Sequence, residues 1–370
     1  NRKFLAGIAL PGGIKVQAQL EVALAGADFT LFVVPSHGMR LASERVAATG
    51  ARSLWVCAAK GLELGTLKRM TEVLGETLGD PDPVLLVGPS HAEEVSRAIP
   101  TSIVAAARTE ERARQVQGLC SSGRLRVYTN RDVAGCEYGA AFKNVIALAA
   151  GICDGLGYGD NTKGALLTRG LAEITRLGVA LGGTRETFYG LTGMGDLITT
   201  AISRHSRNRA VGERLGRGET IEQVLGHMVM VAEGVNTAKA ALELGRKAGV
   251  ETPIIEQVSA ILLERKDPRA ALEALMGRDL KSEEWKGAPG RVAAQDCPRD
   301  RIEALPRDQR GGRAGRGEAA RAPLLGDPVQ HAAPAEEPGR QPHVPPRRGQ
   351  APAADPGVAL RPALHDCRCA

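Results

Sequence analysis

The chain has 370 residues, enough for two domains that each bury a core. Its formal net charge of +6 is modest and spread along the sequence, so charge alone does not indicate a nucleic-acid-binding protein. We find no signal-peptide pattern and no apolar span of about 18 residues, so we expect a soluble, cytoplasmic protein rather than a secreted or membrane-spanning one.

Residues 1–132 alternate between short apolar runs and amphipathic stretches. We predict strands at Phe29–Val34, Ser53–Ala58, Val84–Val87, Thr101–Ala106 and Arg124–Tyr128. We predict helices between them at Leu41–Ala48, Leu67–Thr77 and Glu110–Cys120. The alternation indicates a mostly parallel sheet with helices on its faces, and such sheets bind ligands beyond the carboxyl ends of their strands.

The turns after these strands contain residues suited to ligand binding. Gly88-Pro89-Ser90 opens a helix near His91, where backbone amides and the Ser90 hydroxyl form a seat for an anionic or polar oxygen. Lys60 adds a cation at the same edge. An ordinary strand–helix turn is the alternative interpretation of each motif by itself.

The pattern from residue 133 to residue 283 is helical, with Gly and Pro at the joins. We predict helices at Asp132–Ile152, Lys163–Leu181, Arg207–Leu215, Val235–Ala248, Pro253–Leu263 and Pro268–Met276. This region is therefore predicted to be an all-helical second domain.

Lys143 lies inside the first of these helices, beside Asn144 and among small apolar residues. Ala140, Ala147 and Ala150 share its face of the helix. Partial loss of water disfavours the ammonium and brings its pKa toward the range useful for proton transfer. The alternative is a lysine whose stem lies on apolar surface while its tip reaches water.

Two polar motifs follow in the helical region. Gly193–Leu197 is predicted to be a glycine-rich turn that presents the Asp196 carboxylate, with a simple helix cap as the alternative. Ser206-Arg207-Asn208-Arg209 is predicted to begin a helix, and its donors suit a phosphate group. A solvated charged turn is the alternative there.

The histidines and cysteines give weaker signals. His37, His91 and His205 lack an Asp or nucleophile partner at suitable spacing, so we interpret them as rim or structural residues. No spacing predicts a metal site. Four of the seven cysteines are predicted to be reduced and buried, namely Cys57, Cys120, Cys136 and Cys153.

Residues 284–370 differ sharply in composition from the rest. Thirteen of the 21 prolines lie there, with 13 arginines against a single lysine, and we predict a disordered tail. Out-of-frame translation of GC-rich DNA is one hypothesis for its origin. RNA binding by 307–321 is an alternative function, but acids interrupt the arginines and aromatic residues are missing.

Together these motifs resemble the bacterial type of NAD(P)-dependent glycerol-3-phosphate dehydrogenase. The matching blocks include GPSHAEEV, AAFKNVIALAAGICDGLGYGDNTKGALLTRGLAEITRLG, GLTGMGDLITT and SRNRAVGERLGRG, and the resemblance covers about residues 1–283. It implies reversible reduction of dihydroxyacetone phosphate to sn-glycerol 3-phosphate with NAD or NADP, for phospholipid synthesis. It also implies a Rossmann-like domain in 1–132 and a helical substrate domain in 133–283. The oligomeric state stays open, with a homodimer as one alternative.

The resemblance assigns roles by position. Lys143 matches the proton donor and acceptor, with Asp196 and Lys60 as the other catalytic residues. Substrate contacts are implied at Lys60, Gly88, Ser90, Lys143, Asp196, Ser206, Arg207 and Asn208. Cofactor contacts are implied at Lys60, Ala92, Arg207, Val231 and Glu233. Asp196 would orient Lys143 and hold a substrate hydroxyl, while Arg207 would grip the phosphate.

The chain departs from the family pattern at its beginning. No GxGxxG motif precedes the helical domain, and Gly7, Gly12 and Gly13 lack the spacing. We therefore expect an N-terminally truncated chain with an incomplete Rossmann-like sheet that lacks its first βαβ unit. Such a chain should bind a dinucleotide weakly. A catalytically impaired fragment or scaffold is the alternative function. A hydroxy-acid dehydrogenase fits less well, and the choice between NADH and NADPH stays open.

Overall fold

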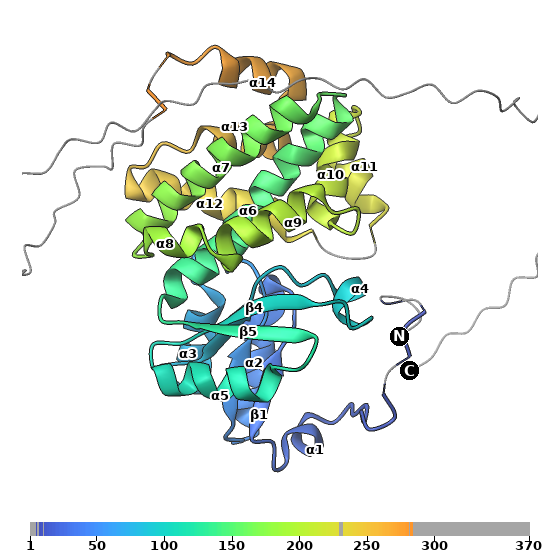
Figure 1. Cartoon of the computed structure of the whole chain (residues 1–370), viewed down its shortest axis with the longest axis vertical. Coiled ribbons are helices and arrows are strands. Elements are labelled where there is room, and N and C mark those ends of the chain that lie inside the picture. The colour runs from blue at the N-terminus through green and yellow to red at the C-terminus, as the bar shows by residue number, and fades with distance from the viewer. Residues whose placement is uncertain (1–4, 6, 10, 229–231, 281, 284–370) are drawn as a thin grey trace, which may run out of the picture. The chain divides into compact units, whose positions relative to one another are not determined.

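Five strands form one sheet in the order β1-β2-β3-β4-β5 (Figure 1). Their bounds are β1 Phe29–Phe32, β2 Leu54–Cys57, β3 Val84–Val87, β4 Thr101–Ala106 and β5 Leu125–Asn130. The pairs β1–β2, β2–β3 and β4–β5 are parallel, whereas β3–β4 is antiparallel. The prediction of a mostly parallel sheet is therefore confirmed, with one antiparallel pair that the sequence did not indicate.

The computed structural model describes residues 5, 7–9, 11–228, 232–280 and 282–283. All its elements belong to one unit of the chain, residues 1–293. The predicted disordered tail, 284–370, lies outside the described residues. The predicted domain boundary between residues 132 and 133 stays a prediction. Within the described part, the structure contains no helix with the length and apolarity that a membrane span requires.

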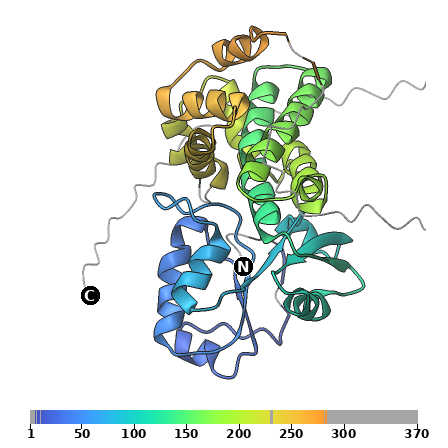
Figure 2. The same ribbon diagram turned by 90° about the vertical axis from the view of Figure 1, so that its left-hand side faces the viewer.

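Alternate side chains of β3 face opposite sides of the sheet, as the two-residue period of a strand requires. Leu85 and Val87 join the core beneath α2 Met39–Ala48 and α3 Met70–Leu78. Val84 and Leu86 join the core beneath α5 Glu110–Cys120. Figure 2 shows the blue and teal helices on opposite sides of the strands. Burial of both faces explains why β3 is apolar throughout.

Short helical segments complete this half of the molecule. They are α1 Leu20–Leu24, η1 Ser36–Gly38 and α4 Ala92–Val95. The predicted helix at Leu67–Thr77 begins later, at Met70, because Leu67 has φ +61° and Leu62 forms a bridge with Arg69. The predicted first strand also ends early, at Phe32.

The helical half is built around α6 Val133–Gly155, a 23-residue helix with all but a few side chains buried (Figure 1). Its neighbours include α7 Asp160–Ala180, α9 Asp196–Ile202, α10 Arg207–Gly216, α12 Glu233–Ala248 and α13 Pro253–Glu264. The remaining elements are α8 Arg185–Phe188, η2 Leu191–Gly195, α11 Ile221–Gly226 and α14 Pro268–Met276. A helix enclosed on every side explains the apolar, Ala- and Gly-rich sequence of α6.

Helices α6 and α10 cross with their backbones in contact. A Cβ atom added at Gly212 of α10 would overlap the carbonyl oxygen of Leu148 and lie 2.9 Å from the amide nitrogen of Ile152. A Cβ atom added at Gly151 of α6 would overlap the carbonyl oxygen of Arg209 in the same way. The glycines therefore allow α10 to lie directly on α6, and this contact sets where α10 begins.

Two predictions for this half need correction. The predicted turn at Gly193–Leu197 is helical, because the π-helical turn η2 leads directly into α9 at Asp196. Cys120, predicted to be buried, is partly exposed at the end of α5, whereas Cys57, Cys136 and Cys153 are buried as predicted.

Candidate functional site

Lys60 lies beyond the carboxyl end of β2 and connects the sheet to the helical half. Its Nζ donates hydrogen bonds to the carbonyl oxygen of Gly88, which follows β3, at 2.7 Å and to Oδ2 of Asp196, which begins α9, at 2.7 Å. Ser90 Oγ donates to the same Gly88 oxygen at 3.0 Å. Lys60 therefore joins the turn after β3 to a carboxylate of the helical half, as expected where parallel strands end at the same edge of a sheet.

Lys143 approaches the same carboxylate from α6. Its Nζ donates to Oδ1 of Asp196 at 2.9 Å and to Oγ1 of Thr200 at 2.6 Å, and Thr200 Oγ1 donates to Asp196 Oδ1 at 3.2 Å. We call Lys60, Lys143, Asp196 and Thr200 the lysine–aspartate centre. Only 4% of Lys143 is exposed, so the interpretation of a lysine tip reaching water is wrong.

The electrostatics of the centre favour proton transfer at Lys143. Burial is the largest cause that lowers the pKa of Lys143; with the charges of Lys60 and Arg207, and against the opposing charge of Asp196, it brings this pKa to about 8. Burial alone would raise the pKa of Asp196, but the charges and hydrogen bonds of Lys143 and Lys60 hold it below its ordinary value. Two of the three N–H groups of a protonated Lys143 are used within the centre, which leaves one for a ligand oxygen.

The start of α10 forms a second polar region. Ser206 is its N-cap, and its Oγ accepts from Arg209 N at 3.2 Å. Asn208 is buried, with Nδ2 donating to Oδ1 of Asn144 at 2.9 Å and Oδ1 accepting from Gly234 N at 2.9 Å. Arg207 is exposed at the first position of the helix. The hydroxyl of Ser206 thus has a capping role, and Asn208 is fixed between α6 and α12.

Glu233, at the start of α12, lies against the carboxyl end of β1. Its Oε1 accepts from Ser36 N at 2.9 Å and its Oε2 accepts from Ser36 Oγ at 2.5 Å. Gly61 has φ +152°, and a Cβ there would lie 2.8 Å from Ser36 Cβ and 3.1 Å from Glu233 Oε2. Only glycine fits this crowded edge. Ala92 begins α4 and is exposed, and Val231 lies outside the described residues.

Three polar residues of this region were not assigned from sequence. Thr200 lies one helical turn after Asp196, a spacing that indicates a shared helix face once 196–202 is recognised as a helix. Asn144 follows Lys143 directly, but its partner Asn208 is 64 positions away. Ser36 lies in a turn whose partner is 197 positions away. Only the first of these contacts leaves a local signal in the sequence.

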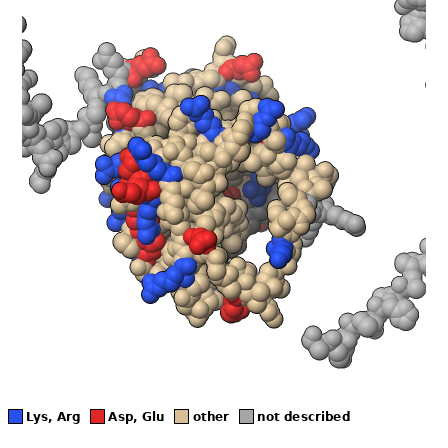
Figure 3. All heavy atoms as spheres, turned by 60° about the horizontal axis from the view of Figure 1, so that its bottom comes forward, with Lys and Arg blue, Asp and Glu red and all other residues tan. Residues whose placement is uncertain are grey.

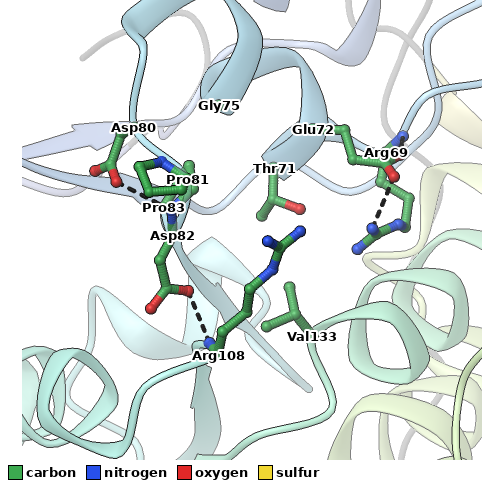
Figure 4. Close-up of a pocket in the computed structure, with 10 residues that line it drawn as sticks. All are labelled: Arg69, Thr71, Glu72, Gly75, Asp80, Pro81, Asp82, Pro83, Arg108 and Val133. Atoms are coloured by element: carbon green, nitrogen blue, oxygen red, sulfur yellow. Dashed lines mark hydrogen bonds and ion pairs between the residues drawn. The ribbon is translucent and has the colours of Figure 1, made fainter.

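A separate cavity of about 250 Å³ lies along α3 (Figure 4). Its lining consists of Arg69, Thr71, Glu72, Gly75, Asp80, Pro81, Asp82, Pro83, Arg108 and Val133. Figure 4 shows the Arg108 side chain extending toward Thr71, and its backbone nitrogen donates to Asp82 at 2.7 Å. No residue of the lysine–aspartate centre lines this cavity.

Comparisons with known proteins match both halves of the molecule to the same family. Residues 1–113 match the family model described as NAD-dependent glycerol-3-phosphate dehydrogenase N-terminus, and residues 132–273 match the corresponding C-terminus model. The chain is 47% identical over 287 residues to a glycerol-3-phosphate dehydrogenase (NAD(P)+) of Prosthecochloris aestuarii, with 76% of this chain and 86% of the relative covered.

A second relative and a solved structure support the same family. The chain is 48% identical over 284 residues to the enzyme of the same name from Desulfitobacterium hafniense, with 76% and 80% covered. A crystal structure of glycerol-3-phosphate dehydrogenase from Coxiella burnetii superposes with a TM-score of 0.72 at 33% identity, over 75% of this chain and 86% of that one. The fold and its order along the chain are therefore shared with solved members.

Proposed function

The chain belongs to the family of NAD-dependent glycerol-3-phosphate dehydrogenases, and from this membership we propose roles for its residues in that reaction. It is an oxidoreductase that interconverts dihydroxyacetone phosphate and sn-glycerol 3-phosphate with NAD or NADP. The observation that supports the proposed roles most strongly is the pair of lysines on one buried aspartate, because such a pair can stabilise and protonate a carbonyl oxygen that becomes negative.

Lys143 acts as the general acid in reduction and as the general base in oxidation. When the carbonyl carbon is reduced, negative charge develops on its oxygen, and the remaining N–H of Lys143 points to that oxygen and gives it the proton. A pKa of about 8 keeps Lys143 mostly protonated at neutral pH while still allowing it to release the proton. Thr200 and Asp196 hold the amine in one orientation through this transfer.

Lys60 and Asp196 support this step without exchanging the proton. The Lys60 ammonium adds positive potential beside the substrate oxygen, and the Asp196 carboxylate offsets the cost of burying Lys143 and partly burying Lys60. Arg207 and the start of α10 bind the substrate phosphate, since a helix N-terminus and a guanidinium both favour an anion. Asn208 is held for the same task by Asn144.

The residues at the carboxyl ends of β1 and β2 fit a dinucleotide. Ser36, Gly61 and Glu233 combine a carboxylate, a hydroxyl and closely approaching backbone, which suit ribose hydroxyl groups. We propose that Glu233 and Ala92, with Lys60 and Arg207 on the side of the centre, hold the cofactor. When bound, NADH or NADPH supplies the hydride for the carbonyl carbon.

The alternative of a fragment or scaffold without catalytic function is not favoured. A scaffold has no need of a buried lysine and a half-buried lysine on one buried aspartate, because burying charged groups is costly unless they are paired. On the face shown in Figure 3, basic and acidic side chains lie intermixed, which gives no support to nucleic-acid binding there. A homodimer and a cytoplasmic location are further proposals, the second supported by Cys57 and Cys136, which are buried and form no disulfide bond with a described residue.

Oxidation of NADH in the presence of dihydroxyacetone phosphate tests the proposed function. The full chain should consume NADH only when the substrate is added, and Lys143→Ala should lower kcat by about 10²–10⁴-fold, the range for loss of a general acid. Lys247→Ala, which changes an exposed lysine of α12 paired with Glu243, is the matched control and should retain activity. Full activity of Lys143→Ala would contradict the proposed role.

A further inference from the structure

His91 presents a buried ring nitrogen without a hydrogen-bond partner. It follows the Gly88–Ser90 turn and is the N-cap residue of α4, yet its side chain makes no capping hydrogen bond. Its Nε2 atom is shielded from solvent and is unpartnered among the described residues. Leaving a buried polar atom unpaired is unfavourable, so this nitrogen is suited to a partner that arrives with a ligand.

The surroundings of His91 place it between the two ends of the substrate site. Its ring packs against that of His205, with centroids 6.2 Å apart, and His205 directly precedes the start of α10. Burial lowers the pKa of His91, and the charges of Lys143 and Lys60 lower it further against the opposing charges of Asp196 and Glu93. The imidazole is therefore neutral at pH 7 and lies within the field of the lysine–aspartate centre.

The triose phosphate has three polar groups, and two of them already have partners under the proposed function. The phosphate faces the start of α10, and the carbonyl oxygen faces Lys143. The terminal hydroxyl was expected from the sequence to meet Asp196, but Oδ1 of Asp196 already accepts from Lys143 and Thr200 and Oδ2 accepts from Lys60, so that one lone pair remains at Oδ2. The hydroxyl is therefore the substrate group with the fewest partners in the protein.

We propose that His91 binds the terminal hydroxyl of dihydroxyacetone phosphate through Nε2 and so helps select this substrate. A neutral imidazole nitrogen is a donor in one tautomer and an acceptor in the other, and a hydroxyl group pairs with either. The ring contact with His205 holds the imidazole in place. This inference rests on the proposed function and adds a specificity-determining residue to it.

Two substitutions separate hydrogen bonding from packing at this position. His91→Phe keeps an aromatic ring against His205 and removes the nitrogen, whereas His91→Gln places an amide nitrogen near the position of Nε2 and removes the ring. We expect KM for dihydroxyacetone phosphate to rise about fivefold in His91→Phe, as for loss of one neutral hydrogen bond, with kcat nearly unchanged. His91→Gln should stay close to the wild type.

A second substrate identifies the group that His91 contacts. Hydroxyacetone phosphate lacks the terminal hydroxyl, so kcat/KM for this analogue should be the same in His91→Phe and wild type. An equal loss on both substrates, no loss on either, or a loss in His91→Gln with none in His91→Phe would overturn the proposal. If the wild-type chain fails to reduce dihydroxyacetone phosphate at all, the proposed function itself fails and this inference falls with it.

Discussion

The crossing of α6 and α10 makes a strong prediction for Gly212→Ala. Gly212 lies in the middle of α10, where alanine is intrinsically the better helix former. The added methyl group, however, would overlap the carbonyl oxygen of Leu148 and approach the amide nitrogen of Ile152 to 2.9 Å. Both obstacles are backbone atoms of α6, so no change of rotamer relieves the overlap and the two helices must separate.

Two opposing effects set the change in the free energy of unfolding of Gly212→Ala. Replacing a helical glycine by alanine stabilises by about 0.5–1 kcal/mol, whereas overpacking a tight interface costs about 1–3 kcal/mol and occasionally more. We expect a net loss of about 1–2 kcal/mol. The matched control is Gly164→Ala in α7, an exposed helical glycine where an added Cβ meets nothing within 4 Å. That control should gain about 0.5–1 kcal/mol.

Thermal unfolding of the full chain measures both changes. A domain of this size shifts its Tm by about 2–4 °C per kcal/mol, so Gly212→Ala should melt about 2–8 °C below the wild type and Gly164→Ala slightly above it. Separation of the helices also moves the start of α10, so KM for the triose phosphate should rise in Gly212→Ala alone. If Gly212→Ala melts as high as Gly164→Ala, the close backbone contact is refuted.

Three further predictions concern the lysine–aspartate centre. The kcat/KM for dihydroxyacetone phosphate reduction should fall as pH rises through about 8, because Lys143 must hold its proton, whereas kcat/KM for glycerol 3-phosphate oxidation should rise. Profiles of kcat/KM against pH in both directions measure this. Thr200→Val leaves an N–H of Lys143 unpaired, so steady-state kinetics should show kcat about tenfold lower with KM little changed, and an unaltered kcat would count against the contact. Asp196→Asn leaves two ammonium groups without their carboxylate, and urea unfolding should show a loss of about 3–5 kcal/mol.

Local patterns in the sequence were sufficient to predict many of the strands and helices. Val84–Val87, Thr101–Ala106 and Glu110–Cys120 were predicted with the bounds that the structure shows. These segments have a continuous apolar run or a clear helical period, and neither depends on distant residues. The antiparallel direction of β4 had no such signal, because strand direction is decided by the path of the chain between strands.

The parts of the site that depend on neighbouring residues in the sequence could be predicted, whereas contacts between distant residues could not. The small residues around Lys143 indicated a buried amine, and its helix did form as predicted. The partner of Lys60 was not readable from spacing, because Asp196 is 136 positions away and meets it only in the folded chain. Ser36 and Glu233 are separated by an even longer stretch. The glycines of 193–195 indicated a turn, and the surrounding helices instead impose a π-helical one.

The link between Lys60 and Asp196 also limits how this architecture can be recombined. In a chimera that takes residues before α6 from one relative and the rest from another, the two charges come from different parents and must still meet at 2.7 Å. The turns that contain Lys60 and Gly88 would therefore have to fit the position of Asp196 in the α9 helix of the other parent. Exchange of the two halves is therefore constrained at this contact, as it is at the contact between Ser36 and Glu233.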